Sequence, residues 1–262
     1  MSLQVFHVDA FTGKPFAGNP AAVCPLAEWL DDDLLRAVAA ENNLSETAYF
    51  VPCGDGYELR WFTPRCEVKL CGHATLASAF VVLQILEPAR DLVRFETRCS
   101  GALTVSREND LFAMDFPALT PWDCANTPAA LISGLGTTPV AVMQIEDIYF
   151  AVYELEEEVR RIHPDLRLLE KLHPAGVAIT AQGDDADFVS RYFAPSYGIP
   201  EDPVTGSTHR SLAPYWAQRL GKTTLRARQV SERGGELWCE VKEKRVIIKG
   251  NAVLTLRGEL LI

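Results

Sequence analysis

Two stretches of this chain share one pattern, and each copy runs into an apolar segment of helical length. The first copy has Phe-Thr-Pro at 62–64 and Cys-Gly-His-Ala-Thr at 71–75, before an apolar stretch ending at Leu86. The second has Phe-Ala-Pro at 193–195 and Glu-Asp-Pro-Val-Thr-Gly-Ser at 201–207, before a stretch ending at Leu220. A helix start offers unpaired N–H groups and the positive end of a dipole, which attract anions. The two copies therefore predict two related halves that can hold a small acid.

Short strands dominate the rest of the chain, because alternating or β-branched runs end repeatedly in Gly, Pro or Asp. We predict strands over 4–8, 46–51, 57–62, 93–96, 103–106, 112–116, 140–144, 148–152, 176–180, 188–193, 237–241, 246–249 and 252–256. Helices are predicted over 31–42, 72–86, 128–135, 155–161, 164–172 and 206–220. The segments 72–86 and 206–220 are apolar all round, which is typical of a helix surrounded by other structure.

The length of 262 residues permits one large domain or two domains of ordinary size. The segment 118–127, bracketed by Pro117 and Pro128 and containing Pro121, is the predicted linker. We therefore expect an N-terminal domain over 1–117 and a C-terminal domain over 118–262. In this division, the last strand of the chain can still join the sheet of the first domain.

Composition limits the classes of function. Hydrophobic residues make up 48% and charged residues 23%, as in a soluble globular protein. The net charge of −10 argues against nucleic acid as a partner, because nucleic-acid binding rests on basic patches. No run of eighteen apolar residues predicts a membrane span, and the N-terminus lacks the basic and apolar regions of a signal peptide. We expect a cytoplasmic protein that does not bind membranes.

The seven cysteines are odd in number and dispersed, without a CxxC pair, and the five histidines do not cluster with them. Neither a zinc site nor a disulfide framework is predicted from such a pattern. We expect no metal, and free thiols at every cysteine except Cys71, whose place beside a helix start leaves a chemical role open.

Several further motifs occur in a fixed order along the chain. They are Asp-Ala-Phe-Thr at 9–12, Gly-Asn-Pro-Ala-Ala-Val at 18–23, Asn-Leu-Ser-Glu-Thr-Ala at 43–48, Phe-Glu-Thr at 95–97 with Gly101, and Gly-Asn-Ala at 250–252. Together with the two opening copies, they resemble the phenazine-biosynthesis (PhzF-like) isomerase family. The resemblance implies an α+β fold of the diaminopimelate epimerase type. That fold has two pseudo-symmetric halves, each a curled mixed sheet around a central helix, with the active site in the cleft between them.

The resemblance gives Glu46 the role of the carboxylate that moves a proton between substrate carbons. Such a group must both take and return a proton, which burial favours by raising a carboxyl pKa toward neutrality. His73 would bind substrate and manage protons beside it. Taken without the resemblance, Glu46 is more simply a solvated glutamate or a helix-terminal cap. A lone histidine is more often structural, but the place of His73 inside Cys-Gly-His-Ala-Thr favours a functional role.

The remaining candidates are substrate-binding residues at the two helix starts. Gly72 lets the backbone approach a ligand closely, because it has no Cβ. In the second copy, the resemblance makes Asp202 orient a polar substrate group and Ser207 hydrogen-bond it, while Gly206 and Thr205 line the helix start. Simple turn chemistry for Asp202 and a helix cap for Ser207 are the alternatives. The neighbouring Glu201 is expected to point elsewhere.

Cys71 discriminates between mechanisms. In the related epimerases and racemases, a cysteine at each helix start serves as a base, and here the corresponding pair is Cys71 and Thr205. Threonine is a poor base at neutral pH, so symmetric racemisation by two thiols is disfavoured, while one-base isomerisation or elimination stays open. A small residue packed at a helix start is the plainer interpretation of Cys71. His209 departs from the small residues expected just after Thr-Gly-Ser. Pro214 falls inside the predicted second helix, where proline removes a hydrogen bond, so the helix either bends there or starts later.

The predicted function is a cofactor-independent PhzF-like isomerase, with catalytic Glu46, His73 and Asp202. Its substrate would be a small, cyclic amino- or hydroxy-carboxylic acid held in the cleft. The alternatives are a lyase or epimerase-like enzyme in which Cys71 is the base, and a non-catalytic protein that binds a small acid. A homodimer is expected from the resemblance and from the general frequency of two-fold dimers.

Overall fold

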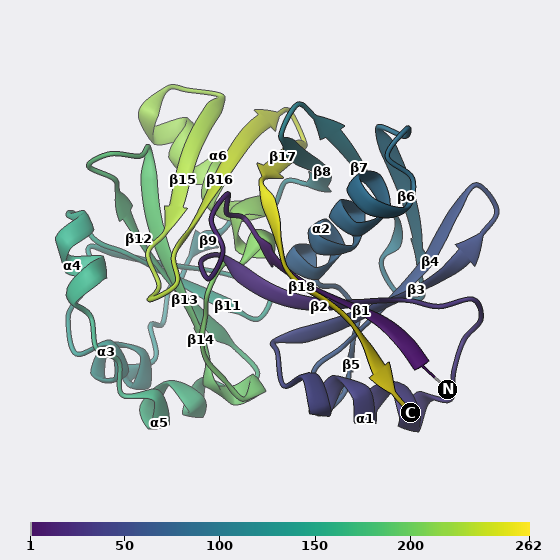
Figure 1. The fold of residues 1–262 in the computed structure, drawn as a ribbon. Helices are drawn as coiled ribbons and strands as arrows, with labels where there is room; N and C mark the ends of the chain where they lie inside the picture. Colours follow the sequence, from purple (N-terminus) through teal and green to yellow (C-terminus); the bar gives the residue numbers. More distant parts are fainter. Residues whose placement is uncertain (1) are drawn as a thin grey trace. The chain divides into compact units, whose positions relative to one another are not determined.

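The computed structural model describes residues 2–262 and divides into two compact units (Figure 1). Unit 1 contains the chain up to Asp115 together with Lys249–Ile262, and unit 2 contains Phe116–Ile248. The proline-bounded segment 118–127 is part of unit 2. Its Ala118 and Leu119 N–H groups donate to the carbonyl groups of Lys244 and Arg210. Hydrogen bonds therefore hold this segment against unit 2, although its composition resembles that of a linker.

Unit 1 is a mixed sheet that surrounds one helix. The strands follow the order β18, β1, β2, β3, β4, β6, β7, β8, with β5 beside β4. Their bounds are β1 Ser2–Ala10, β2 Asn19–Pro25, β3 Glu46–Cys53, β4 Gly56–Phe62, β5 Glu67–Val68, β6 Leu92–Thr97, β7 Gly101–Glu108, β8 Leu111–Pro117 and β18 Ala252–Leu261. The helices are α1 Asp32–Asn42 and α2 Gly72–Phe80, and α2 continues as the π-helical segment η1 Val81–Leu86.

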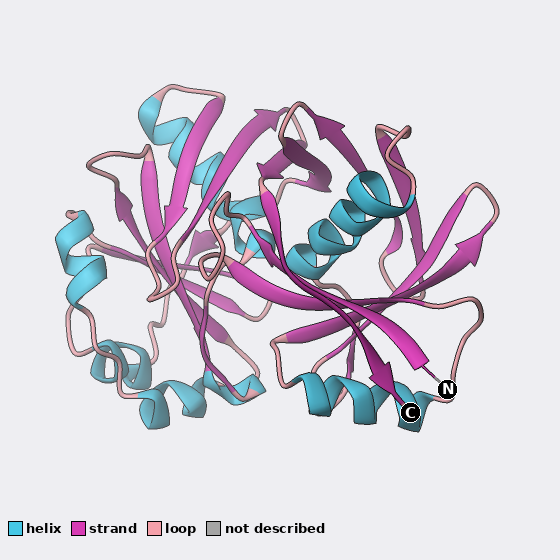
Figure 2. Cartoon of the chain, viewed as in Figure 1, coloured by secondary structure: helices cyan, strands magenta, loops and turns pink. Residues whose placement is uncertain are grey.

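The two helices of unit 1 have different surroundings. Helix α2 contacts β1, β2, β3 and β18, and seven of its nine residues are buried, as expected for a helix without a polar face. Helix α1 instead packs against β3 and β4 from outside the sheet (Figure 2). Strand β3 is consequently buried on both faces over its first six residues, which explains its continuous apolar run.

Unit 2 repeats this plan. Its strands follow the order β9, β10, β11, β12, β13, β15, β16, with β14 beside β13. The strand bounds are β9 Trp122–Asp123, β10 Ala141–Ile145, β11 Ile148–Val152, β12 Gly176–Gln182, β13 Phe188–Ala194, β14 Ile199–Asp202, β15 Thr224–Gln229, β16 Gly235–Lys242 and β17 Arg245–Gly250. The helical segments are α3 Ala129–Leu135, α4 Glu156–Arg161, α5 Leu166–Leu169, η2 Glu170–Leu172, η3 Pro195–Tyr197, η4 Gly206–Thr208 and α6 His209–Leu220.

Strand pairing confirms that the sequence pattern marks a structural repeat. In unit 1, β2–β3 is parallel, β3–β4 antiparallel and β4–β6 parallel. In unit 2, β11–β12, β12–β13 and β13–β15 follow the same sequence of directions. Helix α2 precedes β6 in the first unit, and α6 precedes β15 in the second. Each Phe-x-Pro motif begins at the end of the central strand, β4 or β13.

The second helix differs from the prediction of a continuous segment from Gly206. Residues 206–208 form the 3₁₀ turn η4, and α6 begins at His209. Pro214 lies inside α6 and has no N–H to give to the carbonyl four residues earlier. That carbonyl, of Arg210, accepts the Leu119 N–H at 3.0 Å instead. A segment outside the helix thus satisfies the acceptor that proline leaves.

Candidate functional site

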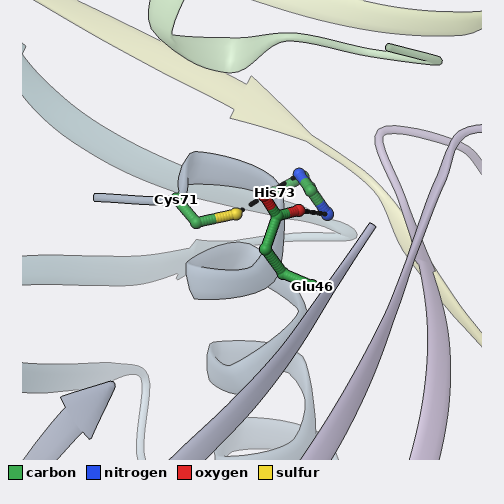
Figure 3. Close-up of side chains that lie close together, drawn as sticks. All are labelled: Glu46, Cys71 and His73. Atoms are coloured by element: carbon green, nitrogen blue, oxygen red, sulfur yellow. Dashed lines mark hydrogen bonds and ion pairs between the residues drawn. The ribbon is translucent and has the colours of Figure 1, made fainter. Parts of the chain in front are cut away.

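Glu46, Cys71 and His73 lie together in unit 1, each less than one-tenth exposed (Figure 3). Glu46 is the first residue of β3, while Cys71 and His73 flank the glycine at which α2 starts. The imidazole contacts both of the other side chains. Its Nε2 is 3.3 Å from Glu46 Oε2, and its Nδ1 is 3.5 Å from Cys71 Sγ. Two predicted catalytic residues and one predicted binding residue thus form one buried cluster.

Asn19, the first residue of β2, defines the hydrogen-bonding state of His73. Its amide Nδ2 lies 3.2 Å from Nδ1 of the imidazole and can only donate. Nδ1 is therefore the acceptor, and the hydrogen of the neutral ring is on Nε2, the nitrogen nearest Glu46. Burial lowers the pKa of His73 to about 3, although a hydrogen bond with the Pro20 backbone opposes the shift. At neutral pH, His73 is an uncharged donor beside a carboxylate.

The start of α2 carries no side-chain cap. Cys71 occupies the N-cap position, its thiol makes no capping hydrogen bond, and the first turn contains no acidic residue. The Cys71 carbonyl accepts the Thr75 N–H at 3.1 Å and the Thr75 hydroxyl at 2.6 Å, which fixes the turn. The first N–H groups of α2 are therefore not engaged by a capping side chain, a setting that favours an anion.

The cluster also contains the donor types of a transition-metal site. One ligand atom each from Glu46, Cys71 and His73 lies within 4.8 Å of the others. The thiol is nearest to Nδ1 and the carboxylate is nearest to Nε2. The three side chains can therefore contact one another directly or share a metal ion, and removal of metals distinguishes the two arrangements.

A second polar cluster lies in unit 2 and contains Asp202 and Thr205, each less than one-tenth exposed. The Thr205 hydroxyl donates to Asp202 Oδ2 at 2.5 Å. Gln229 fixes both residues: its Oε1 accepts the Thr205 N–H at 2.9 Å, and its Nε2 donates to the Asp202 carbonyl at 2.8 Å. Gly206 and Ser207 follow in η4. Ser207 is partly exposed and caps neither η4 nor α6, whose N-caps are Thr205 and Thr208.

His209 packs next to this cluster and has a structural role. It is fully buried, and its Nδ1 lies 2.9 Å from the Thr205 carbonyl, which can only accept. Its ring packs beside Phe188 with centroids 5.6 Å apart. Burial lowers the pKa of His209 to about 4. The residue that departs from the expected small side chain therefore supports the backbone at Thr205 as a neutral donor.

The two units differ most at the position of Glu46. In unit 1, the residue after Glu46 pairs with Phe62 on the neighbouring strand. In unit 2, the residue after Gly176 pairs with Phe193 in the same way, so Glu46 and Gly176 hold equivalent positions. A Cβ added to Gly176 would lie 2.1 Å from the Tyr192 hydroxyl oxygen. The tyrosine thus occupies the space that a side chain would need. Only unit 1 carries a carboxylate at this position of the repeat.

Two polar residues of these clusters were not among the sequence candidates. Asn19 belongs to the Gly-Asn-Pro motif quoted for the family resemblance, so its motif was visible although its contact with His73 was not. Gln229 had no such signal, because one glutamine at the end of an alternating strand is unremarkable in sequence. Its partners come from a loop far away in the chain.

Comparison with known proteins identifies the family. The family model for phenazine biosynthesis-like proteins, PhzC-PhzF, matches residues 8–258. An uncharacterised isomerase of Pseudomonas aeruginosa is 54% identical over 260 residues, covering 99% of each chain. The crystal structure of a PhzF-family protein from Enterococcus faecalis superposes with a TM-score of 0.96 at 46% identity, covering 100% of each chain.

A more distant structure supports the fold alone. A hydroxyproline epimerase from Agrobacterium vitis has a TM-score of 0.62 at 12% identity, over 99% of this chain and 92% of that one. The predicted α+β, epimerase-like fold is thereby confirmed. Because the family model and close relatives match nearly the entire sequence, the chain belongs to the phenazine biosynthesis-like (PhzF) family of isomerases.

Proposed function

We propose that this isomerase moves a proton within a small, cyclic amino- or hydroxy-carboxylic acid, without a cofactor. The observation that carries the proposal is the buried pair of Glu46 and neutral His73, with 3.3 Å between Oε2 and Nε2. A carboxylate beside an uncharged donor remains available as a base. The same donor can stabilise the carboxylate again after it has returned its proton.

In the proposed reaction, Glu46 takes a proton from an activated carbon of the substrate. The electron pair left on that carbon moves along a conjugated system, and Glu46 returns the proton to another carbon. Substrate and product are then isomers, and no oxidant, reductant or leaving group is required.

Substrate binding is assigned to the helix starts. We propose that the N–H groups of Gly72 and His73, which no side chain caps, bind a carboxylate or another polar group. In unit 2, Asp202 orients a polar group of the ligand, and Ser207 offers a hydroxyl that takes no part in capping. Cys71 and Thr205 line these starts, and Gly206 lets the backbone approach the ligand.

The decisive experiment is deuterium exchange in heavy water. Small cyclic amino and hydroxy acids are incubated with the enzyme, and deuterium at carbon is followed by NMR or mass spectrometry. Enzyme-dependent exchange that requires Glu46 supports the proposal. Tight binding without exchange, measured by calorimetry on the same acids, would instead favour a non-catalytic binding protein.

Cys71→Ser separates the proposal from a mechanism in which Cys71 is the base. The contact of Sγ with His73 Nδ1, at 3.5 Å, is the observation that favours the alternative. Under the glutamate mechanism we expect a rate loss of less than about tenfold, because serine keeps a polar group at the N-cap. A thiol base would lose about a hundredfold or more. Cys66→Ser, at an exposed thiol, is the control. Substitution is preferable to alkylation, because Cys53, Cys66 and Cys99 are also exposed.

A metal requirement is tested by removing metals. We expect exchange activity to be unchanged after dialysis against a chelator, because the proposed proton transfer uses the Glu46 carboxylate and requires no metal. The measurement is the exchange rate before and after dialysis, with metal content determined on both samples. Activity that is lost with the chelator and restored by Zn²⁺ would contradict the proposed mechanism.

The expectations about partners remain proposals. Among the described residues, no helix is both long and apolar enough to cross a membrane. The predicted homodimer is tested by light scattering of the purified protein, and the cytoplasmic location by fractionation of the source cells.

A further inference from the structure

The same arginine–glutamate pair occurs in both copies of the repeat. Arg60 of β4 binds Glu67 through two hydrogen bonds of 2.7 Å, from Nε and Nη2. Arg191 of β13 binds Glu201 through the same two atoms, at 2.7 and 2.9 Å. Each guanidinium also lies 4.9 Å from the ring of the phenylalanine two residues along its strand, Phe62 or Phe193. The arginine–glutamate and arginine–phenylalanine contacts are therefore repeated in both units, as the fold is.

In both units the remaining guanidinium nitrogen reaches a helix on the outer side of the sheet. Arg60 Nη1 donates to the Asp32 carboxylate, in the first turn of α1, at 2.8 Å. Arg191 Nη1 donates to the carbonyls of Val159 and Ile162, at the end of α4, at 3.1 and 2.7 Å. Arg60 is 1% exposed, and the Arg191 side chain is 11% exposed. Each arginine side chain is thus mostly buried and has three kinds of partner.

The glutamates hold the same place relative to the candidate site. Glu67 lies four residues before Cys71, and Glu201 lies four residues before Thr205. Cys71 and Thr205 are the N-cap residues of the two helix starts. Glu201 also directly precedes Asp202. The short strand that each glutamate occupies, β5 or β14, is therefore the last regular element before the N-cap residues Cys71 and Thr205.

We propose that these pairs are a duplicated clamp in which Arg60–Glu67 and Arg191–Glu201 position the helix start of their own unit. They are positioning residues, and their link to turnover rests on the function proposed above. A planar guanidinium fixes a carboxylate in distance and in orientation, which lysine cannot do. Anchoring to α1 or α4 gives each glutamate a fixed point in the fold. The chain that follows it then enters the helix start from a defined direction.

The test is site-resolved amide hydrogen exchange of Arg60→Lys and Arg191→Lys, because it requires no substrate. Loss of a charged hydrogen bond corresponds to about a tenfold or larger change in a local opening equilibrium. We expect Arg191→Lys to speed exchange about tenfold over 202–208 and to leave 68–75 unchanged. Arg60→Lys should do the reverse. Each variant thus contains its own control segment.

Arg226→Lys is the external control, because Arg226 pairs with Glu236 at a more exposed position on β15. It should alter neither segment. Equal acceleration of both segments in either clamp variant, or of neither, overturns the inference. If an arginine variant does not fold, Glu67→Gln and Glu201→Gln weaken the same pairs without removing the guanidinium.

Turnover measurements then distinguish a failure of the clamp proposal from a failure of the proposed function. With a substrate whose exchange depends on Glu46, Arg191→Lys should lower kcat/KM about tenfold, and a swap of Arg191 and Glu201 should recover part of it. An active Glu46→Gln variant would refute the proposed function and leave the hydrogen-exchange result standing. A Glu46-dependent enzyme that tolerates both lysine variants would refute the clamp alone.

Discussion

Replacing Glu46 by glutamine is expected to lower the exchange rate by about a thousandfold, within the range attributed to a general acid–base group. An amide cannot take a proton from carbon at neutral pH, whereas it has nearly the volume and shape of the carboxylate. The measurement is deuterium incorporation into the best substrate of the panel, compared at equal enzyme concentration.

The fold of this variant should be retained. Glu46 is 8% exposed, and glutamine keeps an oxygen that can accept from Nε2 of His73. We expect its unfolding free energy to change by about 1 kcal/mol or less, because glutamine nearly matches the carboxylate in volume and can hydrogen-bond as a neutral group. Glu41→Gln, on the exposed side of α1, is the matched control and should leave turnover unchanged. A Glu46→Gln enzyme that keeps more than about a tenth of the rate is incompatible with carboxylate proton transfer.

The second large effect is on stability at mildly acidic pH. His73 and His209 are buried and neutral in the folded protein, where burial lowers their pKa values to about 3 and about 4. In the unfolded chain both return to about 6.5. Because the unfolded state binds more protons below that value, stability falls as pH decreases. The contribution of the two neutral histidines to the free energy of unfolding is fully present above about pH 6.5. It is lost progressively toward pH 4 for His209 and pH 3 for His73.

From about pH 7.5 to about pH 5, the loss is on the order of 2 kcal/mol for each of these histidines. His7 adds a smaller loss of the same sign, since burial also lowers its pKa. Urea denaturation at the two pH values measures the difference. Above about pH 5 most carboxylates remain ionised in both states, so the histidines dominate the change.

His209→Gln isolates one contribution. Glutamine can donate to the Thr205 carbonyl but does not titrate, so the variant should lose about half of the pH dependence. The exposed His163→Gln is the control and should keep the dependence of the wild type. If the wild type is equally stable at both pH values, neutral burial of these histidines is wrong. If His209→Gln does not fold, His209→Asn provides the same test with a shorter side chain.

The repeat was predictable because both copies use the same local devices. Phe-x-Pro ends a central strand, and a glycine between a small and a polar residue opens a helix, so short-range rules locate both copies. The sequence also contains Arg-aromatic-Phe at 60–62 and 191–193, and a glutamate four residues before each N-cap. These signals for the clamp were present but were not used, since a charged pair is interpretable only when both partners are known to meet.

Strands β2 and β15 were not predicted. Strand β2 begins with Asn19-Pro20 and ends at Pro25, and proline usually argues against a strand. Strand β15 alternates leucine or alanine with charged residues over only six positions. Both are nevertheless paired on two sides, because partners distant in the chain supply the hydrogen bonds and apolar surface.

The sequence by itself determined the two-part plan, the α+β class and the residue types available at each helix start. Periodicity, turn residues and motif order are local properties, so they could be recognised without coordinates. Only the tertiary structure decided which of those residues meet. Asn19, Glu46 and His73 come from two strands and a helix, and the burial of His73 where they meet keeps the histidine neutral. Protonation depends on burial and on partners brought from elsewhere in the chain, which no local pattern encodes.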